Sequence, residues 1–467
     1  MIDEKPLIKF KFLELQRKFS FILLFTLFFH QAFSEETDLI EIYNKAVAHD
    51  ALLASVKFEN QATQELISQG RSLFLPSITA NIGYDEKDNE RKILTPEISS
   101  NVLLSGDKAD FHSYDYGITI KQPLFNYGAF QQYKKILSQT SLSEKKLLLA
   151  QQDLMYRVSL VYFETLMARD EIDLLNAQKK SITEQLLEAR ARYNAGLISI
   201  TDVNEAQTKS SMIEAQKIAA IQKLKIKHRQ IESLTGEFPK KIKGINTVIG
   251  FEELKDIIDK WISLAKENNL ELKIKQDEIK IAEGEINVRK SDRYPTIDAV
   301  ATRSRNWDKG GYPYGALQNE GSRSFSDVLG VQINIPIFSG GFASSRIREA
   351  QKLKLKTMED AEYLKRQVEL KVRENYLNLQ ANYAEIEAYQ QALSSSKLQV
   401  ESTQLAFKEG LRNSVEVLVA QQVLFNAKRD LLKSRYNYLM NIINLKLSVG
   451  ILAFEDLQEI NQYLSSQ

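Results

Sequence analysis

Side chains that carry out catalysis or bind metals are few in this sequence, and they are not grouped. The chain has no cysteine, which excludes disulfides, thiolate metal ligands, cysteine nucleophiles and a lipid anchor on an N-terminal cysteine. Its four histidines are scattered without ligand spacing, at His30, His49, His112 and His228. No nucleophile elbow or phosphate-binding loop occurs in the sequence. We therefore expect a protein that is not an enzyme and that needs no metal or cofactor.

Charge and hydropathy narrow the function classes further. Lysine and arginine number 62 and acidic residues 61, so no bulk attraction to nucleic acid or acidic lipid is implied. After the N-terminal region, no stretch of about 18 apolar residues occurs, which excludes a protein that enters the inner membrane by helices. If the chain sits in a membrane, strands must cross it.

The first 34 residues have the pattern of an export signal. Basic residues precede an apolar run from Phe19 to Phe29, and Ala32-Phe33-Ser34 supplies small residues for cleavage. The run is too short to span a bilayer comfortably. A buried core helix or an uncleaved anchor is the alternative, because acidic residues such as Glu14 interrupt the basic region. We expect residues 1–34 to be a signal peptide of an exported protein.

Two halves of the remaining chain share an order of elements and several local sequences. The matching pairs are Leu75 to Ala80 with Tyr294 to Ala299, Gln122 to Gly128 with Ile335 to Gly341, and Tyr193 to Leu197 with Phe407 to Leu411. Self-similarity of this kind indicates a repeated structural unit. We predict a first repeat over residues 35–245 and a second over residues 246–467. Each would hold a helix, a β-hairpin, a long helix and a return helix, and the second would end in a short tail.

Alternating apolar residues predict four strands, two in each half. They are Ile78 to Ile82, Tyr114 to Ile120, Ile297 to Ala301 and Val331 to Ile335, with polar connections near Asp85 to Lys108 and Asn306 to Ser324. Four strands cannot close a barrel alone, so exposed edges must pair with other copies or be protected in another way. A soluble sandwich edge is the alternative. Tyr114, Tyr116 and Trp307 suit an interfacial aromatic girdle, or a simple cross-strand pair.

Each hairpin is followed by an unusually long helical stretch. These stretches run from Tyr127 to Asn194 and from Gly341 to Glu409 without an internal proline, and each would reach about 100 Å. Single glycines, Gly196 and Gly410, suit the left-handed position after a helix. Return helices then run to about Thr235 and Val449, capped by Ser199 or Thr201 and by Asn413 or Ser414. Asp38 to Leu73 and Phe251 to Lys290 supply two more helices.

Along these helices a narrow apolar seam runs on a largely polar cylinder. From Ser414 onward, Val415, Leu418 and Val423 lie among glutamines and basic residues. Such helices suit a barrel that is wet on both faces.

The repeated proline-containing strand starts and the paired glycine turns resemble the TolC-type outer-membrane efflux proteins. The most specific stretches are Ala191 to Val203 and Ser434 to Asn441, and the resemblance covers nearly all of the mature chain. It implies a mixed α and β membrane protein. Three chains would form one 12-stranded outer-membrane β-barrel, with four strands per chain, continuous with a long periplasmic α-helical barrel.

The resemblance also assigns residues. The glycine turns would form the periplasmic tip that contacts an adaptor protein, through Gly196, Leu197, Gly410 and Leu411. Gating contacts would involve Thr201, Asp202 and Arg412, with Arg412 able to bond to Thr201. Phe407 stands where the best-known member has a tyrosine, so it cannot bond to Asp202. Of two acidic positions at the narrowest point, only Glu416 is kept here, because the other is Val419; a ring of Glu416 would favour cations. For Asp202, Glu416 and Arg412, a plain solvated side chain near a helix terminus is the alternative.

The implied function is the outer-membrane exit duct of a tripartite efflux or type I secretion system. Its partners would be two further copies, a periplasmic adaptor (membrane fusion) protein and an inner-membrane RND or ABC transporter, with no nucleic acid. Drugs, metal ions and unfolded proteins all pass through channels of this design, so the cargo stays open. A competing hypothesis is a periplasmic coiled-coil structural or tethering protein, which predicts helices and no closed barrel.

Overall fold

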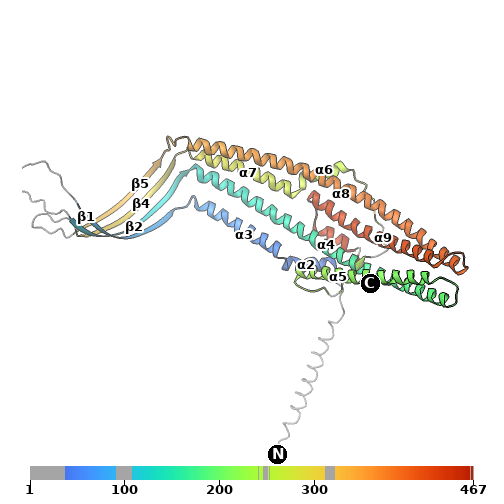
Figure 1. The fold of residues 1–467 in the computed structure, drawn as a ribbon. Helices are drawn as coiled ribbons and strands as arrows, with labels where there is room; N and C mark the ends of the chain where they lie inside the picture. Colours follow the sequence, from blue (N-terminus) through green and yellow to red (C-terminus); the bar gives the residue numbers. More distant parts are fainter. Residues whose placement is uncertain are drawn as a thin grey trace, which may run out of the picture. The chain divides into compact units, whose positions relative to one another are not determined.

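The computed structural model describes residues 37–90, 108–239, 241–245, 251, 253–310, 321–462 and 464–465. The predicted signal peptide lies outside these residues. The chain divides into two compact units, and each unit takes segments from both halves of the sequence. Unit 1 contains Met1–Ala54, Gln151–Glu267 and Leu370–Gln467, whereas unit 2 contains Ser55–Ala150 and Asn268–Glu369. The element order can be followed in Figure 1.

Unit 2 holds a four-stranded antiparallel sheet in the order β1-β2-β4-β5. The strands are β1 (Ser77–Glu90), β2 (Lys108–Asn126), β4 (Thr296–Gly310) and β5 (Ser322–Asn334). All four predicted strands are therefore present. They are longer than expected, since Asp85 to Glu90 and Asn306 to Gly310 belong to strands and not to the connections. Polar residues continue these strands because the backbone pairing of the ladder continues through them, as between Glu86 and His112.

The sheet largely separates apolar from polar side chains, because side chains alternate between its two faces along each strand. One face carries Ile78, Ala80, Ile82, Tyr84, Tyr114, Tyr116, Ile118, Ile120, Ala299, Ala301, Leu329, Val331 and Ile333, which the strand register places together. We call it the apolar face. The other face carries hydroxyl, amide and charged groups, and on it the Thr119 and Thr302 hydroxyls lie 3.2 Å apart. Two such faces fit a sheet with lipid on one side and water on the other.

Helices enter and leave this sheet at one end of the strands. α3 (Ala51–Ser72) and α7 (Leu270–Ser291) precede β1 and β4, and both end a few residues before the prolines of the strand starts. α4 (Tyr127–Asn194) and α8 (Phe342–Lys408) follow β2 and β5. In unit 2, Asp277 of α7 is buried and bonds to Lys145, Lys280 and Ser141, the last at 2.9 Å. Burial alone would raise the pKa of Asp277, but these bonds hold it below its usual value.

Unit 1 consists mainly of two antiparallel helix pairs. α4 pairs with α5 (Ile200–Thr235), and α8 pairs with α9 (Ser414–Val449), where the Asn375 amide donates to the Asn444 carbonyl at 3.2 Å. The predicted long and return helices are confirmed to within one residue at most ends. Short elements complete the unit: α2 (Leu39–His49), α6 (Ile258–Asn268), α10 (Phe454–Gln462) and the small sheet of β3 (Gly244–Ile245) with β6 (Leu464–Ser465). Among the described residues, no helix has both the length and the apolar character that a membrane crossing requires.

Two segments that were each predicted to form one continuous helix are interrupted in the structure. Asp50 separates α2 from α3, because its carboxylate accepts the Leu53 N–H at 2.7 Å and so starts a new helix. Asn269 does the same between α6 and α7, accepting the Leu272 N–H at 3.0 Å. The second stretch begins at Ile258 and not at Phe251, whose ring instead packs against Tyr438 at 5.1 Å between centroids. In both cases a single side chain that competes for backbone N–H groups decides the break.

Buried polar groups join the helices of unit 1 near α2. The Arg157 guanidinium donates to both Asp50 oxygens, at 2.8 and 3.1 Å, and Tyr436 donates to Asp170 at 2.6 Å. Arg169 donates to the Ile242 carbonyl at 2.7 Å. We call these five side chains, Asp50, Arg157, Arg169, Asp170 and Tyr436, the collar. The bonds from Arg157 lower the pKa of Asp50, whereas burial, with Asp170 beside it, raises the pKa of Tyr436.

Candidate functional site

The two glycine turns have the same backbone geometry. Gly196 and Gly410 adopt positive φ angles of 73° and 76°. The following residues close each turn, since the Leu197 N–H donates to the Arg192 carbonyl at 2.9 Å and the Leu411 N–H to the Ala406 carbonyl at 2.8 Å. This six-residue closure satisfies carbonyls that the helix leaves open. A Cβ at either glycine would meet nothing within 4 Å, so the requirement for glycine is the φ angle and not space.

The return helices start with matching caps. Ser199 accepts the Thr201 N–H at 3.2 Å, and Asn413 accepts the Glu416 N–H at 2.9 Å. Of the pairs of candidates in the sequence, Ser199 and Asn413 are therefore the caps. Asp202 and Glu416 lie in the first turns of α5 and α9, where the helix dipole favours a negative charge. Both turns thus present a carboxylate just after the bend.

Large apolar side chains are exposed on the turns. Leu197 and Leu411 are 71% and 79% exposed, and Ile200 is also largely in contact with solvent. Both turns therefore expose a large apolar side chain at the same position. We call residues 192–203 and 406–418 together the tip.

The predicted gating residues do not all meet within one chain. Arg412, in the turn before α9, donates to Glu416 in the first turn of α9 at 3.0 Å, and both side chains are more than one-third exposed. The Thr201 hydroxyl accepts from Ser199 at 3.1 Å. Among the described residues, Arg412 has no hydrogen bond to Thr201. The structure of one chain therefore brings Arg412 together with Glu416, and leaves Thr201 and Asp202 on the other turn.

One contact between the two helix pairs was missed by sequence reasoning. The Arg192 guanidinium carbon lies 4.1 Å from the centroid of the Phe407 ring, and Phe407 is only 4% exposed. Arg192 also forms an ion pair with Glu188, at 3.0 Å. A cation over an aromatic face is attracted by the ring quadrupole. Phe407 thus has a partner although it lacks a hydroxyl, but nothing in the sequence pairs it with an arginine of the other half.

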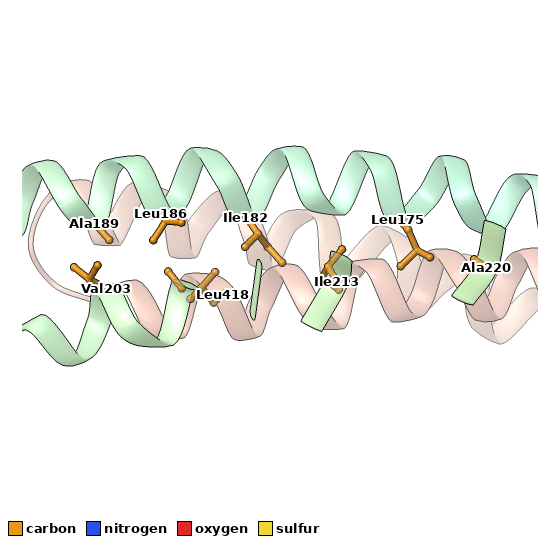
Figure 2. Close-up of a cluster of buried hydrophobic side chains, with 9 residues drawn as sticks. Leu175, Ile182, Leu186, Ala189, Val203, Ile213, Ala220 and Leu418 are labelled. Atoms are coloured by element: carbon orange, nitrogen blue, oxygen red, sulfur yellow. The ribbon is translucent and has the colours of Figure 1, made fainter. Parts of the chain in front are cut away.

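Behind the tip, an apolar seam holds α4 against α5. It comprises Leu175, Ile182, Leu186, Ala189, Val203, Ala206, Ile213 and Ala220, with Leu418 of α9 added from the second helix pair. Figure 2 shows these side chains meeting in one row between the helices. Gln178 of α4 also donates to Gln422 of α9 at 3.3 Å. The seam is narrow, as predicted, and it contains three alanines among larger aliphatic side chains.

The polar side chains of the tip, all of whose residues the structure describes, are not grouped as metal ligands. The part of the chain that the structure describes contains no group of three histidine or acidic side chains that could hold a metal ion. What the tip offers is a pair of bends with exposed leucines, two carboxylates and a few weak contacts between helix pairs.

These features define a class of protein, the outer-membrane channels built from helical hairpins and four strands per chain. The sequence matches the family model described as "Outer membrane efflux protein" over residues 42–237 and 261–451. The chain belongs to this family.

Individual relatives agree with the family. The chain is 27% identical to outer membrane protein TolC of Vibrio cholerae, over 91% of this chain and 93% of the relative. It is 26% identical to the proteases secretion protein PrtF of Dickeya chrysanthemi, over 92% and 91%. The solved structure of the CmeC outer membrane channel of Campylobacter jejuni shares the fold, with a TM-score of 0.72, 14% identity, and coverage of 91% of this chain and 90% of that one.

The expected class, location and fold are thereby confirmed. The protein is an outer-membrane exit duct for efflux or secretion, with a periplasmic helical part. Its family and fold are those of channels and not of enzymes.

Proposed function

We propose that three copies of the chain form one continuous channel, with a 12-stranded barrel in the outer membrane. The observation that carries this proposal is the four-stranded sheet, in which β1 and β5 are edge strands. Unpaired edges are unfavourable in lipid, where every backbone group needs a partner, and a closed barrel removes them. Pairing β5 of one copy with β1 of the next satisfies both edges. A coiled-coil tether would need no such sheet.

The same proposal extends to the partners. A periplasmic adaptor would bind the tip through Gly196, Leu197, Gly410 and Leu411, where the exposed leucines supply apolar area. The energy for transport would come from an inner-membrane RND or ABC transporter, since the channel itself has no nucleotide-binding signature. The name of PrtF refers to protease secretion, and this supports a role in type I secretion beside efflux.

Gating would take place at the tip. In the closed state, the contact of Arg192 with Phe407 would join the two helix pairs of one chain. Arg412 would contact Thr201 and Asp202 of another helix pair once the copies assemble. Opening would separate the helix pairs and break these contacts. Three copies of Glu416 around the threefold axis would give the closed tip a preference for cations.

Single-channel conductance in a planar bilayer tests this proposal. Purified, detergent-extracted protein should form stable trimers with a small, cation-selective conductance. Arg412→Ser should raise the conductance, and Glu416→Ala should reduce the cation selectivity. If no channels appear and the protein extracts into water without detergent, the barrel is wrong and the coiled-coil hypothesis replaces it.

The docking surface can be tested separately. Because the chain has no cysteine, Leu197→Cys or Leu411→Cys creates its only thiol, which can carry a photo-crosslinker. We expect crosslinks to a purified cognate adaptor from both positions. Thr183→Cys on α4, whose hydroxyl bonds to its own helix, is the control and should give none. Equal crosslinking from all three positions would contradict docking at the tip.

A further inference from the structure

The apolar face of the sheet is interrupted by three charged side chains. Arg303 lies opposite Ile118 on one side and Asp327 on the other, and Arg305 lies between Tyr116 and Phe325. All six side chains belong to the apolar face by strand register. Charged groups on the lipid-facing side of a barrel cost free energy that increases toward the middle of the bilayer. Their presence therefore needs an explanation.

The two arginines are held in different ways. Arg305 is only 18% exposed: it donates to Asp327 at 3.2 Å and to the Ser304 carbonyl at 2.9 Å, and it lies over the Phe325 ring at 4.8 Å. Arg303 is 72% exposed and approaches the same carboxylate only at 3.6 Å. One carboxylate thus faces two guanidinium groups, and the cluster keeps an excess positive charge. Arg305 is fixed in place, whereas Arg303 presents its donors outward.

The cluster borders a hollow on the same face. Its volume is about 730 Å³, and Arg303, Arg305 and Asp327 line it together with Ile82, Ile118 and Leu329. A charged group therefore lies directly beside an apolar surface large enough for hydrocarbon chains. This combination matches an amphiphile with an anionic head.

The position along the strands agrees with a membrane interface. Toward the helices, the apolar face continues with Ala301, Val331 and Ile333. Away from the helices come aromatic rings, with Tyr114 and Trp307 at 6.2 Å and the Arg323 guanidinium over Trp307 at 4.5 Å. Aromatic rings at this boundary are typical of the lipid headgroup level. Because the helices are periplasmic, the cluster lies on the side of the outer leaflet.

From these observations we propose that Arg303 and Arg305 bind the phosphate of a membrane lipid in the outer leaflet, with its acyl chains along Ile82, Ile118 and Leu329. The proposal rests on the barrel proposed above, which turns this face toward lipid. Guanidinium groups suit phosphate because their planar donors bond to two oxygens at once. Asp327 orients Arg305 and limits the affinity, since it competes with the phosphate for the same donors.

Native mass spectrometry of the full-length protein in detergent tests the proposal. The probes are dioleoyl phosphatidic acid and dioleoylglycerol, which share their acyl chains and differ in the phosphate. We expect retained phosphatidic acid, up to one per chain, and little dioleoylglycerol. The double variant Arg303→Gln/Arg305→Gln should weaken phosphatidic acid binding about tenfold or more, because hydrogen bonds to charged groups are lost. Lys121→Gln, which removes an ion pair with Asp298, is the control and should bind as the parent does.

Asp327→Asn separates a phosphate site from a structural ion pair. It frees both guanidinium groups, so phosphatidic acid should bind at least as tightly as before. The single variant Arg303→Gln guards against misfolding, because this exposed side chain can be changed without disturbing the sheet, and it should weaken binding on its own. Equal binding of both lipids, unchanged binding by the double variant, or a loss in Asp327→Asn as large as that in the double variant would overturn the proposal. So would displacement of the lipid by an equal concentration of inorganic phosphate, which would assign the site to the free ion.

Failure of the proposed barrel can be distinguished from failure of the proposed lipid site. Conductance measured on the same preparations makes this distinction. Channels without selective lipid binding contradict only the lipid site, whereas the absence of channels contradicts the barrel.

Discussion

The tip and the collar belong to the same unit, yet their polar contacts are of different kinds. In the collar, Asp50 is buried and receives two bonds from Arg157, and Tyr436 bonds to Asp170 beneath the surface. At the tip, Arg412 and Glu416 form an exposed pair, four residues apart, at the start of α9. Removing one partner of a buried pair costs several kcal/mol, whereas an exposed pair contributes about 0 to 1 kcal/mol.

On the proposal that the tip is the gate, we infer separate tasks for the two regions. A gate must open at a small cost in free energy, so weak and exposed contacts suit it. The helices that carry the gate must keep their packing while it moves, and buried bonds such as that of Tyr436 serve this purpose. We therefore expect changes in the collar to affect stability and changes in the tip to affect conductance.

The largest expected effect is the loss of stability in Asp50→Ala. It leaves the Arg157 guanidinium without its main partner and removes the cap of α3, so we expect a loss of about 2 to 4 kcal/mol. Hydrogen exchange at the start of α3 and chemical unfolding would measure it. Asp153→Ala is the matched control, because Asp153 is the exposed partner of the same arginine, one helical turn away. Equal losses in both variants would remove the distinction between buried and exposed contacts.

A smaller effect, on gating and not on stability, is expected from the contact of Arg192 with Phe407. Phe407→Leu keeps an apolar group but removes the aromatic face, and Arg192→Gln removes the charge. Each should favour the open tip by about 1 kcal/mol, roughly a fivefold change in the open-to-closed ratio. Single-channel recordings would show it as longer or more frequent openings.

Arg190 offers a control in the same helical turn. It bonds to Gln207 at 2.8 Å and contacts no aromatic ring among the described residues. Arg190→Gln should therefore leave the open probability unchanged. A change equal to that of Arg192→Gln would point to overall charge, and not to the contact with Phe407.

A weaker effect on gating is expected from the exposed pair of Arg412 and Glu416. Glu416→Gln removes the bond from Arg412, which contributes about 0.5 kcal/mol or less, and it removes one carboxylate per copy from the pore. We expect a reduced preference for cations with a change in open probability of about twofold or less. The selectivity should also fall as salt concentration rises, because salt screens exposed charges. A selectivity that stays the same in the variant would place Glu416 away from the pore.

The sequence predicted the elements better than the contacts between them. Gly196 and Gly410 mark both turns, because the left-handed conformation restricts the residue type there. Strand alternation likewise identified the sheet. By contrast, the partner of Phe407 lies in the other half of the chain, and no local pattern specifies such a pair. The Asp50 break was missed for a different reason, since the contact is local: the Asp50 carboxylate accepts the Leu53 N–H, but an aspartate within a helical pattern does not by itself mark a break.

The smallest effect is expected on the stability of the collar when pH is lowered moderately. The bonds from Arg157 hold the pKa of Asp50 below its usual 3.8, so Asp50 stabilises the collar fully above that value. This stabilisation is lost only as pH falls through the lower pKa of the folded state. Between pH 8 and pH 5 we therefore expect the difference in unfolding free energy between the parent and Asp50→Asn to stay constant, and below about pH 4 it should shrink. Urea unfolding at several pH values would measure this difference. If it already declined at pH 6, a group other than the Asp50 carboxylate would control the strength of the collar.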